Sequence, residues 1–332
     1  MDTKGTKTFI KNILHQNSLR TEQDFELLLR RRLEEKENNI RFEATDSNGK
    51  KCIVKVSISH LGNTVQHTGI RAKMNLNNEI RFYNYVKDLK FKDLVIPEFV
   101  AGKEGNPAYL IIEKMMPEEY VIFPDDMGYT GDQFPDFFAK SFVSGMHEFQ
   151  QIKADKEYFL VMSENDIATW LGSMSEVFSD FENAKYQKVV DLFEKYFNLW
   201  TNSMDTLSHS DILPDALGYS VNTKKLLLLD FEKVQVSYSS FDFSAMVKSP
   251  LMKDWIEDKF EPELFSIYKE EEFRILYNLS KALRLLTGLK NLKTGFIDHV
   301  FEAMLGKDKF EKVKPVAMDI DVEMLGRALE EF

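Results

Sequence analysis

Two carboxylates in the stretch Asp205–Val247 stand where they could perform chemistry together. Asp211 follows His209 in a segment rich in turn residues, and Asp230 comes directly after the leucines Leu226–Leu229. In phosphoryl transfer one Asp orients the attacking hydroxyl and another binds Mg²⁺ on the phosphates. A loop carboxylate followed by a short buried hairpin that ends in a second carboxylate suits that chemistry.

Both carboxylates also have an ordinary structural interpretation. Asp211 is compatible with an N-cap or Asx turn, and Asp230 with a strand-end residue that caps the next turn. A His-x-Asp match arises by chance in many chains. The order and spacing of further features must therefore decide between the interpretations.

The composition indicates a folded chain with room for two domains. The sequence has 332 residues, of which 43% are apolar and 29% charged, which is typical of a globular protein. Its formal net charge of −11 argues against general nucleic-acid binding, which requires basic surface. The same charge is compatible with a cationic substrate, although solubility explains it equally well.

Targeting and cross-linking signals are few. Cys52 is the one cysteine, so the chain can form neither an intrachain disulfide nor a cysteine-based metal site. The N-terminal segment has no apolar core followed by small residues, so we expect no secretory signal. No run of apolar residues reaches the ~18 needed to span a bilayer. We expect a cytoplasmic protein without a membrane partner.

A β-hairpin is predicted over Ile40–Ser57. Apolar and polar residues alternate on both sides of the turn Asp46–Gly49, whose Asn-Gly pair is its strongest signal. On the return strand Lys55 and Ile53 share one face, because side chains alternate along a strand. A solvated surface lysine is the alternative interpretation of Lys55.

A helix and two strands should follow the hairpin. The helix carries Glu79, which is alternatively an ordinary first-turn glutamate stabilised by the helix dipole. Strands are predicted at Val95–Phe99 and Pro107–Glu113. Pro117, after two methionines, ends the second strand. We place the domain limits there, with an N-terminal domain over residues 1–114 and a C-terminal domain over 115–332.

The remaining sequence is mostly helical in pattern. Segment 8–36 has helical periodicity, although Leu28–Glu34 also fits a first strand, and the loop 125–132 fits either a metal or substrate loop or a solvated turn. Further helices are predicted at 137–150, 167–170, 189–200 and throughout 251–332, with Gly288 as a helix stop.

Taken in order, these features resemble the aminoglycoside phosphotransferase/choline kinase-like family, a branch of the protein-kinase-like fold. The family pattern reads H-G-D-x-x-x-x-N, followed by a hydrophobic strand and D-[FW]-[EDG]. The matching residues here run from His209 to Ala216 and from Asp230 to Glu232. The resemblance implies an α+β, two-lobed fold. Its small N-terminal lobe has an antiparallel sheet and one main helix, and its larger C-terminal lobe is mostly helical.

The resemblance also implies roles for the small-lobe residues. Lys55 would contact the α- and β-phosphates of the nucleotide, and Glu79 would pair with it. Ile53 would lie against the adenine, and backbone groups from Glu113 to Met115 would bond the base. Together these residues would bind ATP or GTP.

In the C-terminal part the resemblance assigns the chemistry. Asp211 would be the catalytic base, with His209 supporting its loop, and Asp230 would bind Mg²⁺. Asp242, in Phe241-Asp242-Phe243, would accept backbone hydrogen bonds from the catalytic loop. Lys55, Asp211 and Asp230 are expected to meet around one triphosphate.

The sequence departs from the family pattern at several positions. Ala216 stands where the family has the Asn that completes a second metal site, and a methyl group cannot coordinate Mg²⁺. Ser210 replaces the usual Gly. The expected phosphate-covering loop, Lys36–Asn39, contains no glycine to give it backbone freedom.

Two functions follow from the resemblance. The first is an ATP- or GTP-dependent phosphotransferase that acts on a hydroxyl of a small molecule, such as an aminoglycoside- or choline-like amine-bearing alcohol. The second is a catalytically impaired kinase-like protein that binds a nucleotide or a partner. An unrelated helical interaction protein would require every match to be accidental.

Overall fold

The computed structural model describes residues 3–24, 27–29, 39–57, 76–124, 134–174, 180–247, 252–296, 298, 302 and 306–332. The acidic loop 125–132, the alternative strand 28–34 beyond residue 29, and residues 36–38 of the expected phosphate loop lie outside these ranges.

The chain divides into two compact units. The first contains Met1–Phe91, Ile96–Tyr120 and Leu228–Val234, and the second contains Lys92–Val95, Val121–Leu227 and Gln235–Phe332. Asp230 therefore belongs to the same unit as Lys55 although the two lie far apart in sequence. The domain limits at residue 114 stay a prediction.

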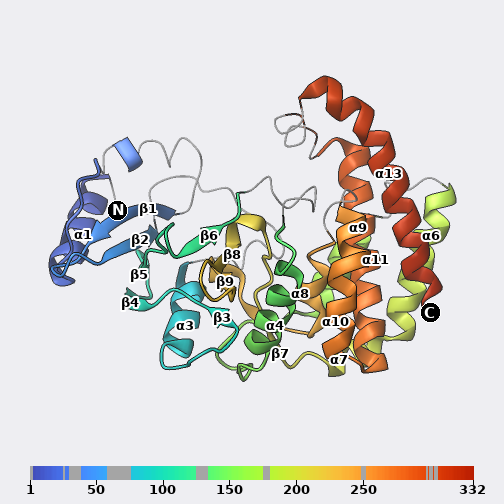
Figure 1. Cartoon of the computed structure of the whole chain (residues 1–332), viewed down its shortest axis with the longest axis horizontal. Coiled ribbons are helices and arrows are strands. Elements are labelled where there is room, and N and C mark those ends of the chain that lie inside the picture. The colour runs from blue at the N-terminus through green and yellow to red at the C-terminus, as the bar shows by residue number, and fades with distance from the viewer. Residues whose placement is uncertain are drawn as a thin grey trace. The chain divides into compact units, whose positions relative to one another are not determined.

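A four-stranded antiparallel sheet forms the centre of the first unit, in the order β1-β2-β5-β4 (Figure 1). The strands are β1 (Asn39–Thr45), β2 (Lys51–Ser57), β5 (Tyr109–Glu113) and β4 (Phe99–Lys103). The predicted hairpin is confirmed, and Gly49 adopts φ +86° in its turn, a conformation that favours glycine.

The two faces of β2 have different partners. Cys52, Val54 and Val56 pack in an apolar cluster with Ile10 and Ile13 of helix α1 (Thr3–Gln16). Because side chains alternate along a strand, Ile53 and Lys55 project from the opposite face. Helix α3 (Leu76–Val86) supplies the partner of Lys55 on that face.

The predicted strand Val95–Phe99 is wrong, because its residues belong to two sheets. Leu94–Val95 (β3) pairs in parallel with β9 (Leu226–Leu228), whereas β4 begins at Phe99 and pairs with β5. Pro97 lies between them and has no N–H to donate, so it separates the two strands.

The second unit combines small sheets with many helices. One sheet has the order β3-β9-β8-β6, with β8 at Leu217–Ser220 and β6 at Tyr120–Ile122. A second sheet pairs β7 (Thr206–Ser208) with β10 (Gln235–Ser237). The helices are α4 (Phe138–Gln150), α5 (Glu164–Gly172), α6 (Asp180–Lys195), α7 (Phe197–Asn202), α8 (Ser240–Ser244), α9 (Lys253–Trp255), η7 (Ile256–Phe260), α10 (Glu261–Ile267), α11 (Glu271–Thr294) and α13 (Lys307–Glu330).

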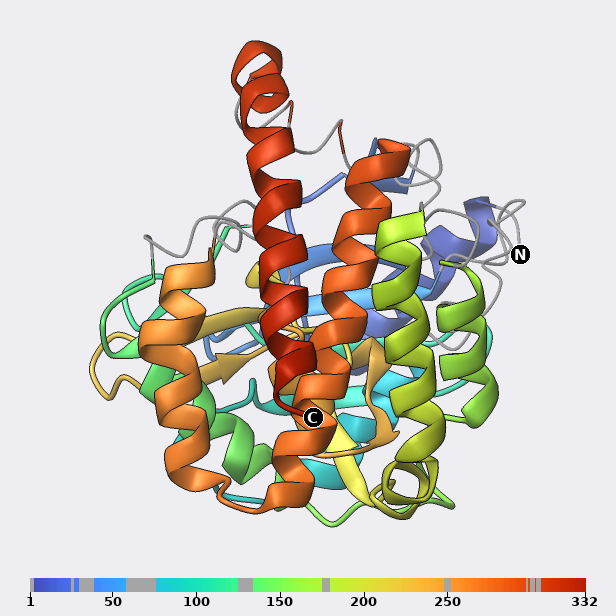
Figure 2. The ribbon, with the colours of Figure 1, turned by 90° about the vertical axis from the view of Figure 1, so that its right-hand side faces the viewer.

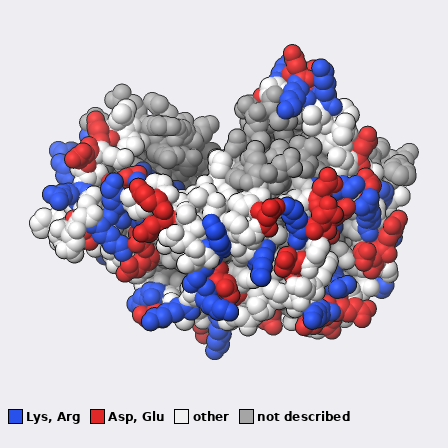
Figure 3. All heavy atoms as spheres, viewed as in Figure 1, with Lys and Arg blue, Asp and Glu red and all other residues white. Residues whose placement is uncertain are grey.

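This architecture confirms the predicted α+β class, with a small antiparallel sheet in one unit and mostly helices in the other. Helices α6, α11 and α13 lie side by side (Figure 2). None of the helices in the described ranges is long and apolar enough to cross a membrane. On the face shown in Figure 3, basic and acidic side chains are interspersed rather than gathered by sign.

The prediction that Gly288 stops a helix is wrong. Helix α11 continues to Thr294, and Gly295 ends it with φ +70°. Gly288 instead allows α13 to approach closely, because a Cβ atom at this position would lie 3.0 Å from Asp321 Oδ2.

Asp321 of α13 is buried where α13 packs against α11. Its residue exposure is 2%, and its Oδ2 atom has no hydrogen-bond partner among the described residues. Burial raises the pKa of the Asp321 carboxyl well above its ordinary value. The folded chain therefore favours the protonated carboxyl, and ionising it opposes folding.

Asp321→Asn should stabilise the protein at neutral pH. Because the Asn side chain carries no charge that burial penalises, we expect a higher free energy of unfolding at pH 7 than in the wild type. The folded state binds the extra proton, so wild-type stability falls as pH rises from the unfolded-state pKa of about 3.9 to the higher folded-state pKa. Urea denaturation from pH 3 to 8 should show the gain disappearing at the acidic end. A gain independent of pH would contradict this explanation.

Candidate active site

Lys55 connects two acidic side chains of the first unit. Its Nζ atom donates to Glu79 Oε1 and Oε2 at 2.9 and 2.8 Å, and to Asp230 Oδ1 at 2.9 Å. The three residues come from β2, from α3 and from the segment after β9. The predicted pairing of Lys55 with Glu79 is present, and Asp230 joins it.

Helix α3 holds the segment that carries Asp230. Asn78 Nδ2 donates to the backbone carbonyls of Glu232 at 3.0 Å and Val234 at 2.7 Å. Phe231 stacks on Phe82, with ring centroids 4.0 Å apart. These contacts fix Asp230, although its backbone has φ +60°, a left-handed conformation that Asp tolerates better than most residues.

The three charged groups differ in their access to solvent. The side chains of Glu79 and Lys55 are 0% and 9% exposed, whereas that of Asp230 is 50% exposed. Burial lowers the pKa of the Lys55 ammonium, but the charges of Glu79, Asp230 and Glu232 outweigh it and raise that pKa overall. Lys55 is therefore a fixed positive charge, and Asp230 is the carboxylate that a ligand from solvent can reach.

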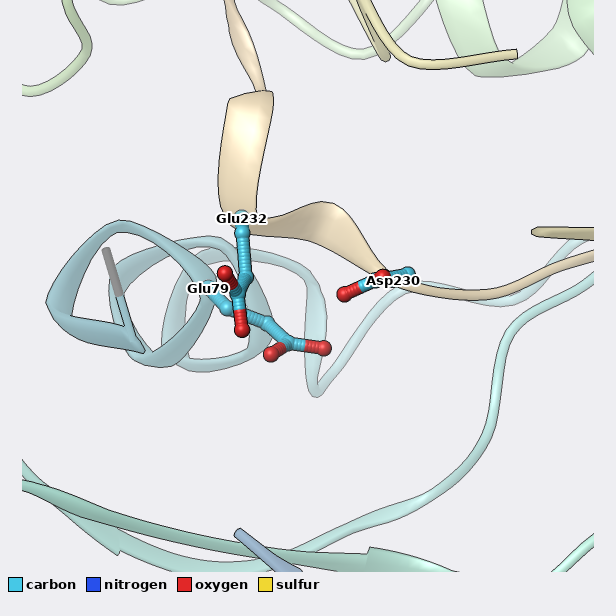
Figure 4. A group of neighbouring side chains, drawn as sticks. All are labelled: Glu79, Asp230 and Glu232. Carbon is cyan, nitrogen blue, oxygen red and sulfur yellow. The ribbon is translucent and has the colours of Figure 1, made fainter. Parts of the chain in front are cut away.

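Glu232 adds a third carboxylate, for which the sequence indicated no role. Figure 4 shows Glu79, Asp230 and Glu232 pointing toward one another, and one oxygen of each lies within 4.8 Å of the others. Asn39 Nδ2 donates to Glu232 Oε1 at 2.8 Å. Burial, together with the charges of Glu79 and Asp230, raises the pKa of Glu232 to about 7, and Lys55 opposes this effect.

These carboxylates fit a hard divalent cation such as Mg²⁺, which prefers oxygen ligands. Both oxygens of Glu79 already accept hydrogen bonds from Lys55, so Asp230 and Glu232 are the better candidate ligands. The third residue of the Asp-Phe-Glu motif was the signal for Glu232, but only the folded segment shows that its side chain turns toward Asp230.

In the second unit, Asp242 organises the loop that precedes Asp211. Its Oδ1 accepts from Ser208 Oγ and from the backbone N–H of Ser210, and its Oδ2 accepts from the backbone N–H of His209, all at 2.8 Å. Asp242 is fully buried. Asp242 thus accepts the backbone hydrogen bonds that the sequence predicted for it.

Asp242→Ala should destabilise the protein by about 3 kcal/mol or more, because each buried donor left unpaired costs roughly 1–3 kcal/mol. Asp254→Ala is the control, since Asp254 is exposed and surface substitutions usually change stability by less than about 0.5 kcal/mol. Chemical denaturation measures both effects. Equal losses in the two variants would contradict the role of Asp242.

Ser210 adopts a left-handed backbone conformation at the position where the family pattern has glycine. Its backbone has φ +64°, which normally favours glycine. The Ser210 hydroxyl lies 2.8 Å from Ser208 Oγ and accepts from Gln235 Nε2 at 3.0 Å. Local hydrogen bonds therefore offset the strain, and the replacement does not prevent the turn.

His209 and Asp211 occupy different environments. His209 is fully buried, and its Nδ1 accepts a hydrogen bond from the backbone N–H of Asp211 at 3.3 Å. Asp211 is partly exposed. A buried imidazole suits the supporting role expected of His209, and the exposed part of Asp211 suits a group that meets a substrate.

Ala216 is buried in the short helix η4 (Pro214–Ala216), with 3% exposure. Its methyl group offers no ligand atom. The exposed neighbour Asp215 is a separate position and does not restore the missing amide.

Part of the expected base-binding segment is already engaged. The Glu113 N–H donates to the Glu98 carbonyl at 2.9 Å, and the Lys114 N–H donates to the Lys51 carbonyl at 3.0 Å. These two N–H groups are engaged, so the carbonyl groups of this segment and the Met115 N–H stay the predicted partners of a nucleotide base. Ile53 is 8% exposed and projects from the Lys55 face of β2.

Comparison with known proteins finds similarity in structure alone. No family model matches the sequence, and no curated protein sequence matches it. The chain resembles amicoumacin kinase (13% identity, 97% of this chain and 93% of that chain covered, TM-score 0.53). It also resembles a choline/ethanolamine kinase family protein from Mesorhizobium loti (12% identity, 89% of each chain, TM-score 0.53). A microcompartment-associated aminopropanol kinase is similar too (14% identity, 88% and 89% covered, TM-score 0.51).

At these identities the likeness establishes the fold. The predicted protein-kinase-like fold of the aminoglycoside phosphotransferase and choline kinase type is confirmed. The resemblance spans nearly the whole of each chain, so it covers both units.

Proposed function

We propose that this protein transfers the γ-phosphate of ATP or GTP to a hydroxyl group of a small molecule. The observation that carries the proposal is the hydrogen-bonded set of Lys55, Glu79 and Asp230, at 2.8–2.9 Å. In this fold a lysine fixed by a glutamate, beside an acidic metal ligand, binds nucleotide phosphates. Structural likeness to kinases that act on small molecules supports the same conclusion.

Residues of the first unit bind the nucleotide and its metal ion. Lys55, held by Glu79, neutralises the α- and β-phosphates. Ile53 and backbone groups from Glu113 to Met115 contact the base. Asp230 and Glu232 are the side chains that would hold Mg²⁺, which supplies positive charge to the phosphates when it is bound.

Asp211 accepts the proton of the acceptor hydroxyl. The hydroxyl oxygen forms a bond to the γ-phosphorus as the bond from that phosphorus to the β,γ-bridging oxygen breaks, and the nucleoside diphosphate leaves. Aligning these groups is the main contribution of the protein to the rate. Asp242 and His209 keep the Asp211 loop in place for this step.

Ala216 favours a second candidate function, a kinase-like module that binds nucleotide or a partner without turnover. Its methyl group removes one of the ligands that the family uses for a second metal ion. Glu232 keeps a second carboxylate beside Asp230, which is why we prefer the enzyme.

Thermal-shift titration with ATP and GTP, with and without Mg²⁺ or Mn²⁺, tests the proposal. We expect one nucleotide to raise the melting temperature in a metal-dependent way, and acceptor alcohols to stimulate release of nucleoside diphosphate. Binding without turnover toward any acceptor would favour the second candidate. No shift with any nucleotide and metal would overturn both nucleotide-based functions.

A further inference from the structure

Arg284 of α11 is held between two aromatic rings of the second unit. Its guanidinium carbon lies 5.0 Å from the ring centroid of Trp170 in α5 and 4.8 Å from that of Phe241 in α8. Trp170 is itself fixed, because its Nε1 donates to Thr287 Oγ1 at 2.8 Å. Stacking restrains the guanidinium plane and leaves its N–H edge to interact with other groups.

That edge lacks a partner among the residues that the structure describes. Arg284 Nε is buried without a hydrogen bond, and no ion pair with Arg284 occurs in the described ranges. A guanidinium carries five N–H donors, and burying them unpaired is costly. The residue is not wholly buried, so part of it borders solvent.

The electrostatic surroundings connect Arg284 to the proposed catalytic loop. Burial lowers the pKa of the Arg284 guanidinium, and the charges of Asp242 and Asp211 oppose that effect. Phe241, which stacks on Arg284, directly precedes Asp242, whose carboxylate holds the loop before Asp211. An arginine with open donors therefore stands in the neighbourhood of the proposed base.

We infer that Arg284 binds a carboxylate of the acceptor, so that the acceptor is a hydroxy acid, including hydroxy amino acids. The inference rests on the proposed phosphotransferase function and adds the chemical class of its acceptor. A planar guanidinium donates two parallel hydrogen bonds to a carboxylate. An acceptor that carries only positive charge would instead be repelled by Arg284.

Matched acceptor pairs test this inference. Serine and ethanolamine, threonine and 1-aminopropan-2-ol, and homoserine and 3-aminopropan-1-ol differ within each pair only by the carboxylate. Release of ADP or GDP is measured with each acceptor at saturating nucleotide and Mg²⁺. Charge-assisted hydrogen bonds contribute about 1.5–3 kcal/mol, so we expect kcat/KM to favour the acid of the reactive pair by roughly 10- to 100-fold.

Variants assign the preference to one side chain. Arg284→Gln should abolish it, and Arg284→Lys should lose most of it, because lysine keeps the charge but not the paired donors. Arg274→Gln is the matched control. Arg274 lies on the same helix and stacks on Phe265 at 4.7 Å, but it is exposed. It should retain the wild-type preference, and the melting temperature of each variant shows whether it is folded.

The outcomes separate this inference from the function on which it rests. Equal or better use of the amino alcohols, or an acid preference that survives in both Arg284 variants, overturns the inference while the phosphotransferase remains. Nucleotide binding and hydrolysis without stimulation by any acid in the panel overturns it as well. Absence of nucleotide binding would contradict the proposed phosphotransferase function, and therefore also the inference about its acceptor.

Discussion

Asp211→Asn is expected to lower the rate of phosphoryl transfer about 10²- to 10⁴-fold, the usual contribution of a positioned acid–base group. Asn has nearly the shape of Asp but cannot accept the hydroxyl proton. Nucleotide affinity should stay close to the wild-type value, since the proposed phosphate contacts come from Lys55. Steady-state kinetics combined with a thermal-shift titration measures the two effects separately.

Asp215→Asn is the control for this variant. Asp215 is an exposed carboxylate on the same stretch of chain, and removing its charge should leave the rate within a small factor of wild type. Full activity of Asp211→Asn would show that another group is the base. An equal loss in both variants would point to the negative charge of the loop rather than to Asp211 itself.

Lys55→Met is expected to have the largest effect on stability as well as on nucleotide binding. It leaves the fully buried Glu79 without its partner, and breaking a buried pair in this way costs about 3–5 kcal/mol. The phosphates lose their fixed positive charge at the same time. Urea denaturation should show the loss of stability, and the thermal shift with nucleotide and metal should disappear.

Two further variants separate folding from binding. Lys50→Met removes a lysine directly before β2 that pairs with Glu98 and Glu113 at the surface, and exposed pairs contribute only about 0–1 kcal/mol. Lys55→Met combined with Glu79→Leu replaces both buried charges by apolar groups, which should restore much of the stability. Nucleotide binding should remain absent in that double variant. Recovered binding would contradict the role of Lys55.

Local rules predicted the parts of the fold that depend on neighbouring residues. The Asn-Gly turn predicted the hairpin, and strand alternation put Lys55 on the face that α3 covers. Parts that depend on distant segments were less predictable. Val95 pairs with a strand far along the sequence, and Gly288 serves close packing against Asp321 rather than a helix end. The identity of glycine alone does not distinguish these two uses.

The same limit applies to the candidate site. The order of motifs indicated Lys55, Glu79 and Asp230, and the structure brings these three together. The sequence showed Glu232 only as the third residue of the Asp-Phe-Glu motif. Its place beside Glu79 and Asp230 arises from folding and could not be predicted. Arg284 belongs to no motif. The aromatic rings that stack on Arg284 come from two other helices, so the sequence of its own helix could not have indicated its environment.

Calorimetric titration with ATP in the presence and absence of Mg²⁺ tests the central claim most directly, when wild type is compared with Asp230→Asn. We predict that wild type binds more tightly with Mg²⁺ and that Asp230→Asn loses this metal dependence. Asp136→Asn, at a surface carboxylate that is 95% exposed, should retain it. Metal-independent binding by wild type, or an unchanged metal dependence in Asp230→Asn, would contradict the account.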